Sequence, residues 1–581
     1  MTPNGGPTAP VPGFAPAPVP AEGGLPPPLP SPDELEEPAD GGQARPPPFP
    51  DDPLEFLYEH RINFAAGGVP LVTIRLTEGQ TEIRLTSGSP LTVALRGAGP
   101  KSVRVPARAT LSLRLGRSKP AEVRHFVQVG DLLWRDHEAV SAARALWRSR
   151  GFQVSTRVLG TVFGITGRVL DNRHTVVLLG EGDDAAAAER LIREVGRRFG
   201  VTATDYQELS RRPRGVVEIA DGTGAVVAAS LDLAIISADG GATILVNQVE
   251  FGKGYPFHGR QDRRYRGRLY VTIGADGRLA LVEAVPLEDL LRGLVPKEIY
   301  AAAPPAALEA QAVTARGEVL AKIGMRHLID PYLLCAEQHC QVYGGAGGEQ
   351  PSTDAAVAAT RGEALFSKDG VLVDSVYSAV CGGQTENNET VWGTPPDPSL
   401  RGVSDLVEGA APDLRREAAL RRWVESDPPG YCGLASFAGP GKYRWTRRLG
   451  AAEIDRLLAP LGVGRILALR PYARGVSGRA TALAVRGDHG ATEIRGELSI
   501  RRWLGGLNSS AFVVDVELGP GGKPAVFVFH GAGWGHGVGM CQTGAIGRAR
   551  RGQSYRQILR HYFGGAEIVR IYGSGPSSGG R

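Results

Sequence analysis

The sequence predicts an α+β, multidomain protein. A β-rich body with short helices around a cleft follows a small βαββα module and a disordered, proline-rich N-terminus. The chain has 581 residues, which suggests about three or four units. Seventeen of its 43 prolines lie within residues 1–50. Beyond them, short runs alternate apolar and polar residues, and only a few stretches have helical spacing.

Composition excludes several classes of protein. A hydrophobic content of 42% is ordinary, so the body is expected to fold. The net charge of +5 is too small to indicate a nucleic-acid partner, although it mildly favours an anionic polymer. No run of about 18 apolar residues occurs, so no transmembrane segment is expected. The start, MTPNGGPTAP, lacks the pattern of a secretion signal.

The N-terminal third divides into three predicted parts. Residues 1–50 are low in complexity and cannot bury apolar area, which predicts a disordered tether. Residues 51–120 alternate with a period of two and predict a small antiparallel β-unit. Residues 121–210 predict a βαββα module, with helices in EAVSAARALWRSRG and DDAAAAERLIREVGRRFG. A body over 211–573 and a disordered tail over 574–581 complete the prediction.

The module resembles a SPOR domain, a small unit that binds glycan stripped of its stem peptides. The opening FVQVGD, the helix followed by RGF and the alanine-rich last helix carry this resemblance. A generic ferredoxin-like scaffold is the alternative.

The body opens with two predicted helices in VPLEDLLRGLVPKEIYAAAPPAALEAQAVTARGEVLAKIG. The first ends near Pro296, and Gln311 and Arg316 stand beside the apolar stripe of the second, placed to reach a cleft edge. Glu298 lies in the break between the helices. Its apolar neighbours would raise the pKa of its carboxyl by desolvation. Spacing alone leaves Glu298 as a surface residue or a helix cap.

Four separated motifs resemble the SpoIID/LytB family, over residues of about 215–573. They are VPLEDLLRGLVPKE with PPAALEAQAVTAR, DPYLLCAEQHCQVYGG, DSVYSAVCGGQTENNETVWG, and GWGHGVGMCQTGAIGRARRGQSYRQILRHYF. One position departs from the family pattern, because Gln384 stands where the family usually has histidine.

This resemblance implies cleavage of peptidoglycan glycan strands by a lytic transglycosylase, with Glu298 at the position of the catalytic glutamate. One carboxyl suffices when the sugar's own 6-hydroxyl attacks, provided that the carboxyl starts protonated. Glu386 and Glu389 are the candidates for a second carboxylate, which a hydrolase needs. The alternatives are a non-catalytic modifier of a cell-wall amidase and a glycan-binding scaffold.

The same motifs suggest the substrate-binding residues. The set comprises Gln311, Arg316, Tyr343, Thr385, Glu386, Trp392, His536 and Gln542. Trp392 and Tyr343 are expected to stack on sugars, with core packing as the alternative. Peptidoglycan lies outside the cytoplasm, so we expect a periplasmic or extracellular location. Truncation, an incorrect start or a nonclassical route would then explain the missing signal.

Cysteine and histidine also predict a metal site. Cys335, His339 and Cys340 offer soft ligands that suit zinc, and Cys381 could complete a tetrahedron. Some family members hold zinc near this stretch, and we expect a structural role for it. A disulfide from Cys335 or Cys340 to Cys381, or buried thiols, are the alternatives.

Overall fold

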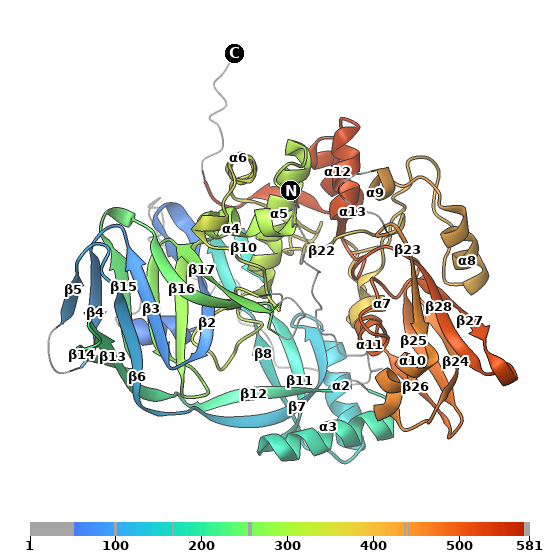
Figure 1. Ribbon diagram of the computed structural model, residues 1–581, viewed down its shortest axis with the longest axis horizontal. Helices are drawn as coiled ribbons and strands as arrows, with labels where there is room; N and C mark the ends of the chain where they lie inside the picture. The colour runs from blue at the N-terminus through green and yellow to red at the C-terminus, as the bar shows by residue number, and fades with distance from the viewer. Residues whose placement is uncertain are drawn as a thin grey trace, which may run out of the picture.

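The computed structural model describes residues 52–97, 101–165, 168–201, 203–253, 258–337, 339–434, 437, 439 and 441–573. It confirms a mixed, β-rich α+β chain built from several sheets. Figure 1 shows a β body, a smaller module with two helices, and a C-terminal β region, with a group of helices above them. The predicted tether over 1–50 and the tail over 574–581 lie outside the described residues.

Two antiparallel sheets form the β body. The larger has the order β1-β2-β19-β18-β15-β4-β5, with β20 parallel to β2. Its strands are β1 (Asn63–Ala65), β2 (Val69–Gln80), β4 (Leu91–Leu95), β5 (Ser102–Val105), β15 (Leu233–Ala238), β18 (Arg268–Ile273), β19 (Leu279–Pro286) and β20 (Leu334–Cys335). The second has the order β14-β13-β6-β3-β16-β17. Its strands are β3 (Glu82–Ser87), β6 (Leu111–Lys119), β13 (Arg214–Ala220), β14 (Val226–Leu231), β16 (Ile244–Phe251) and β17 (Gly259–Tyr265).

The β-unit predicted for residues 51–120 does not form a sheet of its own. β2 pairs with β19, and β6 pairs with β13, so both sheets combine strands from before and after the module. Apolar side chains from both segments, including Ile74, Leu113 and Val271, share one core. The module is therefore inserted between β6 and β13, where Lys119 and Arg214 are partners in the register.

The module contains one strand more than the predicted βαββα pattern, and a hairpin. Its elements are β7 (Glu122–Leu133), α2 (His137–Ser149), β8 (Val154–Leu159), β9 (Val162–Ile165), β10 (Arg168–Asp171), β11 (His174–Asp183), α3 (Ala185–Phe199) and β12 (Thr204–Arg211). The main sheet has the antiparallel order β12-β7-β11-β8. Asp136 and Asp184 cap the two helices by accepting backbone N–H bonds.

Contacts fix the module to the body. One face of its sheet is covered by α2 and α3 around Trp147, and the other meets Met325 and Leu328. The β9–β10 hairpin adds Phe163 to the core of the body. Asn172 donates from Nδ2 to the carbonyls of Leu320, Ala321 and Ile323, at 3.2, 3.1 and 2.8 Å. The module is thus docked against the C-terminal end of a body helix.

The helical group consists of α4 (Leu287–Glu298), α5 (Pro305–Lys322), α6 (Pro351–Ala359), α12 (Gln542–Arg550) and α13 (Tyr555–Tyr562). Helix α5 is buried along most of its length, and α4, α6, α12 and α13 all contact it. Helix α4 follows β19 directly and runs through Pro296 to Glu298, two residues beyond the predicted end. Helix α1 (Pro53–Tyr58) packs on the larger sheet.

Two three-stranded sheets build the C-terminal region. One contains β23 (Arg444–Gly450), β28 (Pro524–Ala532) and β27 (Phe512–Leu518), and the other contains β24 (Ile466–Arg474), β25 (Ala480–Gly487) and β26 (Ala491–Arg495). The helices here are α7 (Asn388–Trp392), α8 (Glu417–Ser426), α9 (Tyr431–Leu434), α10 (Ala451–Leu458) and α11 (Glu497–Trp503). Two short pairs, β21 (Glu363–Phe366) with β30 (Glu567–Arg570) and β22 (Tyr377–Ser378) with β29 (Met540–Cys541), tie this region to the helices. Among the described residues, no helix combines the length and apolar character needed to cross a membrane.

Candidate active site and metal cluster

Glu298 is the last residue of α4, where the backbone changes from helix to the extended conformation of Ile299. The residue keeps part of its surface exposed, although protein atoms surround its carboxyl. Burial raises the pKa of Glu298 to about 8, and the negative charge of Glu318 raises it further, against opposing effects of Lys322 and the Val342 N–H. A carboxylate at a helix C-terminus is also disfavoured by the helix dipole. Glu298 is therefore protonated at neutral pH.

Glu318 is the carboxylate that the sequence reasoning missed. It lies on α5 and forms an ion pair with Lys322, which also donates to the carbonyl of Cys340 at 3.1 Å. Gln311, Glu318 and Lys322 are spaced i, i+7 and i+11, so one face of α5 presents all three. That periodicity is the signal that could have found Glu318 and Lys322 from the position of Gln311.

Gln542, the first residue of α12, bonds both Glu298 and Gln311. Its Nε2 donates to the backbone carbonyl of Glu298 at 2.8 Å and to Oε1 of Gln311 at 3.1 Å. The Nε2 of Gln311 is buried and has no hydrogen-bond partner in the part of the chain that the structure describes. An unpaired buried amide N–H is costly, so it is a ready donor for a ligand at this site. The expected proximity of Gln311 and Gln542 to Glu298 is therefore observed.

Tyr377 adds a hydroxyl next to the two carboxyl groups. It donates to Oε1 of Gln341 at 2.8 Å. Burial raises the pKa of Tyr377, and the charges of Glu298 and Glu318 raise it further, so the phenol stays protonated. A neutral phenol beside two carboxyl groups can donate a hydrogen bond and cannot serve as a base at neutral pH.

His536 holds the glycine-rich loop in place. Its Nε2 donates to the carbonyl of Tyr377 at 2.9 Å, and its Nδ1 accepts from the N–H of Val538 at 3.1 Å. Burial and nearby arginine charge lower the pKa of His536 to about 3, so the ring is neutral. Both ring nitrogens already have hydrogen-bond partners, so only the face of the ring is available for contact with a ligand. That ring lies 5.2 Å from the half-buried ring of Trp392, centroid to centroid.

Arg316 and Tyr343 do not have the predicted exposed positions. Arg316 is 0% exposed and forms a bidentate pair with Glu288, at 2.8 and 3.0 Å. Tyr343 is 2% exposed and lies 5.9 Å from Tyr265, ring to ring. The prediction that Arg316 reaches a cleft edge is wrong, since its guanidinium neutralises a buried carboxylate. Tyr343 follows the alternative of core packing.

Thr385 and Glu386 are also enclosed. Thr385 accepts from the N–H of Val403 at 2.7 Å and is 1% exposed. Glu386 is 0% exposed and accepts from the N–H groups of Val476 and Ser477, both at 3.0 Å. These contacts hold a turn of the C-terminal region. Glu389, the other expected carboxylate, forms an ion pair with Arg401. The charges that shift the pKa of Glu298 are those of Glu318 and Lys322, and neither Glu386 nor Glu389 is among them.

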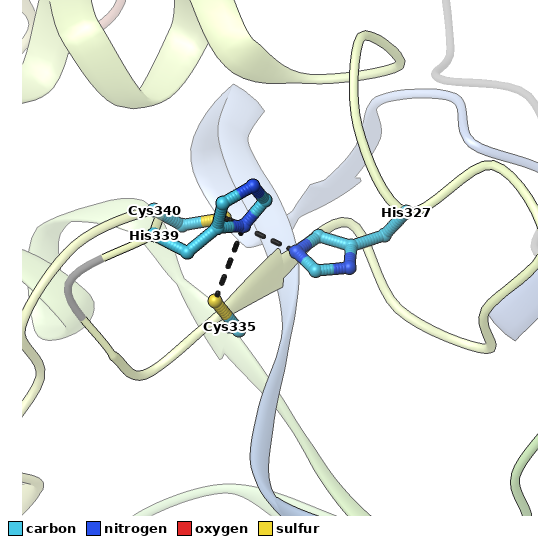
Figure 2. A group of neighbouring side chains, drawn as sticks. All are labelled: His327, Cys335, His339 and Cys340. Atoms are coloured by element: carbon cyan, nitrogen blue, oxygen red, sulfur yellow. Dashed lines mark hydrogen bonds between the residues drawn. The ribbon is translucent and has the colours of Figure 1, made fainter. Parts of the chain in front are cut away.

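Four metal-ligating side chains meet at the loop that follows α5 (Figure 2). His327 Nε2 is 3.2 Å from Cys340 Sγ, and His339 Nδ1 is 3.8 Å from Cys335 Sγ and 3.6 Å from Cys340 Sγ. Tetrahedral zinc would separate sulfur and nitrogen ligands by about 3.5 Å. His327 Nδ1 bonds Asp330 at 3.0 Å, an orienting partner of the usual kind. The residues therefore fit zinc.

Three of the four predicted ligands belong to this cluster. Cys335, His339 and Cys340 meet here, but the fourth is His327 and not Cys381, which lies in a second cluster. All five cysteines are free, so the alternative disulfides to Cys381 do not occur. The cluster borders the site of Glu298, because Gln341 and Val342 follow Cys340 directly. A bound ion would therefore fix the loop that presents them.

Comparison with known proteins supports the family resemblance. Residues 275–366, which include Glu298 and α5, match the family model described as "Stage II sporulation protein". This match and the relatives below support the resemblance of the chain to the SpoIID/LytB family. Residues 386–539 also match a domain of unknown function, DUF8618.

Curated relatives agree with this assignment. Stage II sporulation protein D of Bacillus subtilis is 29% identical over 307 residues, which cover 49% of this chain and 75% of that protein. An uncharacterised protein of Brachyspira hyodysenteriae is 29% identical over 311 residues, 52% of this chain and 72% of its own length. The amidase enhancer of Bacillus subtilis is 26% identical over 300 residues, 48% of this chain but only 40% of that protein.

Proposed function

We propose that this protein, which resembles the SpoIID/LytB family, acts in the cell envelope and cleaves peptidoglycan glycan strands as a lytic transglycosylase, with Glu298 as the acid and base. One observation carries the proposal: burial and Glu318 raise the pKa of the Glu298 carboxyl to about 8, and the residue keeps part of its surface exposed. A general acid must hold its proton at the working pH and remain reachable by substrate.

In the proposed reaction, Glu298 donates its proton to the glycosidic oxygen as the bond to the anomeric carbon breaks. The resulting carboxylate then takes the proton of the sugar's 6-hydroxyl as that oxygen attacks the same carbon. The products are a 1,6-anhydro end and a free hydroxyl on the leaving sugar, and Glu298 regains its proton. The free amide N–H of Gln311 would donate to a sugar oxygen, and Gln542 would hold both residues in register.

Glu318 would act through its charge. Its carboxylate pairs with Lys322 and favours the protonated form of Glu298, so it positions a proton without transferring one. If Glu318 instead activated water, the enzyme would be a hydrolase and would leave reducing ends.

Product analysis on purified glycan strands tests the proposal. We expect 1,6-anhydro ends, and a loss of about two to four orders of magnitude in the Glu298→Gln variant with glycan binding retained. Glu389→Gln is the matched control, because it alters a glutamate of another of the four motifs, one that pairs with Arg401. Reducing ends would show that the enzyme is a hydrolase and not a transglycosylase. Cleavage near the native rate in Glu298→Gln would refute the role of Glu298.

A second candidate is a non-catalytic modifier of a cell-wall amidase, which the match to an amidase enhancer favours. The two functions separate in one assay. A modifier would stimulate a purified amidase equally well as the native chain and as Glu298→Gln, and would release no glycan ends by itself.

Two further roles complete the proposal. Zinc at His327, Cys335, His339 and Cys340 would be structural, since four protein ligands leave no open position for substrate. The module of residues 122–211, whose sheet order β12-β7-β11-β8 is that of a split β-α-β fold, would bind glycan as a SPOR domain does.

A further inference from the structure

Four side chains that the proposed function does not use meet in the core beneath the glycine-rich loop. Cys381, Asp405, Cys432 and Cys541 are at most 3% exposed, and their ligand atoms all lie within 4.8 Å of one another. They come from four segments: the chain after β22, the loop before α8, α9, and β29. Ordinary core packing does not require three thiols and a carboxyl in contact.

We propose that Cys381, Cys432, Cys541 and Asp405 bind one zinc ion, at a site separate from the His327 cluster. The distances between the ligand atoms suit a zinc ion. Cys381 Sγ lies 3.6 Å from Cys432 Sγ and 3.4 Å from Asp405 Oδ2. Tetrahedral zinc would place two sulfur ligands about 3.7 Å apart, and a sulfur and an oxygen ligand about 3.5 Å apart. Three thiolates select a soft ion over magnesium or calcium.

Asp405 is oriented as a ligand would be. Its Oδ1 accepts from Arg548 Nε and Nη2, at 3.1 and 2.9 Å, and from the Tyr562 hydroxyl at 2.8 Å. Its Oδ2 faces the sulfur atoms. One oxygen is thus held by outer partners while the other is directed at the cluster, which is the usual arrangement around a metal-bound carboxylate.

The surroundings also stabilise thiolate. Cys541 Sγ accepts from the N–H of Cys381 at 3.1 Å and from the N–H of Gly544 at 3.3 Å, at the N-terminus of α12. Three thiolates and a carboxylate carry more negative charge than a divalent cation supplies, and the Arg548 guanidinium with these N–H dipoles offsets part of the excess. Gly544 is required for this proximity, because a Cβ there would collide with Asp405 Oδ2 and the Tyr562 hydroxyl.

The ion would have a consequence for the active site. Cys541 immediately precedes Gln542, whose amide bonds the Glu298 carbonyl and Gln311. An ion that holds Cys541 against Cys381 and Asp405 would therefore fix the start of α12, and with it the position of Gln542. This site would be a positioning element, because none of its ligands is placed to touch substrate.

Metal content of the full-length chain tests the inference. In the Cys335→Ser/Cys340→Ser double variant, which disables the His327 cluster, we expect about one zinc per chain. Adding Cys432→Ser to this variant should remove it. Cobalt loaded into the double variant should show the intense sulfur-to-metal charge-transfer absorption of a tetrahedral thiolate site. These readouts do not involve activity, so they can fail or succeed independently of the proposed glycan cleavage.

Other results would overturn the inference. A double variant that is folded but metal-free would do so, and so would a Cys381–Cys432 disulfide in the peptide map of the native protein. If the double variant does not fold, the single Cys432→Ser variant is compared with the native chain. It should contain about one zinc fewer per chain, and an unchanged zinc content would refute the site.

Discussion

Replacing Glu298 by glutamine should stabilise the protein while it abolishes the proposed chemistry. The pKa of Glu298 rises from 4.5 to about 8 on folding, chiefly through burial. The folded state therefore holds a proton that the unfolded chain releases above about pH 4.5. The stability associated with this proton is fully present below that pH and is lost as the pH rises through about 8. Glutamine does not ionise in either state, so the variant does not lose this stability as the pH rises.

The magnitude follows from the difference between the two pKa values. Each pH unit between about 4.5 and 8 costs the native chain about 1.4 kcal/mol of unfolding free energy relative to the variant. The accumulated difference is about 3 kcal/mol at pH 7 and about 5 kcal/mol above pH 8. These figures are upper limits, because part of Glu298 is exposed and water reduces the cost of burying its charge.

Urea denaturation at pH 5, 6, 7 and 8 measures this difference directly. The curves of the native chain and of Glu298→Gln should converge near pH 5 and diverge steadily above it. Glu389→Gln, which breaks the ion pair with Arg401, should show no such gain at neutral pH. If the stability difference between native chain and Glu298→Gln is independent of pH, the carboxyl is not protonated in the folded state and the proposed acid role fails with it.

The other predictions concern the surroundings of Glu298. Glu318→Gln removes a charge that raises the pKa of Glu298, so the alkaline limb of the pH–rate profile should move below about pH 8; an unmoved limb would contradict the coupling. Cys340→Ser should lower zinc content by about one per chain and lower Tm together, checked by elemental analysis and calorimetry; normal zinc content would exclude Cys340 as a ligand. Trp392→Ala should weaken binding of soluble glycan fragments without lowering Tm; unchanged affinity would leave Trp392 to packing alone. Deleting residues 1–210 should yield insoluble protein, because the deletion removes β2 from the larger body sheet and β6 from the second one; a soluble product with normal turnover would contradict the fold.

Local sequence patterns predicted individual helices and strands, but they could not predict which distant strands pair with one another. Period-two runs correctly indicated the strands within residues 51–120. Which strands pair across an insertion depends on contacts between residues about a hundred positions apart, such as Lys119 with Arg214. The sequence left that arrangement open. The fourth strand of the module, β12, was absent from the predicted βαββα pattern of residues 121–210.

The candidate site shows the same limit. Motif positions indicated Glu298, Gln311 and Gln542, and these three do meet. Residue spacing cannot distinguish a polar side chain at the surface from one in a buried ion pair. For this reason Arg316 was predicted at a cleft edge, although it pairs with Glu288 in the core. Nor could it show that Cys381 joins Cys432 and Cys541, because that cluster draws on segments up to 160 residues apart.

The neighbouring positions of Lys119 and Arg214 determine how the module can move. A domain joined by one linker sweeps through many orientations, and its benefit is a higher local concentration of whatever it holds. This module is attached by two adjacent strands and by a hairpin set into the core of the body, so it is a fixed arm. A glycan strand held by such an arm would reach Glu298 from one direction. The arm would then select which bond along the strand is presented to the carboxyl.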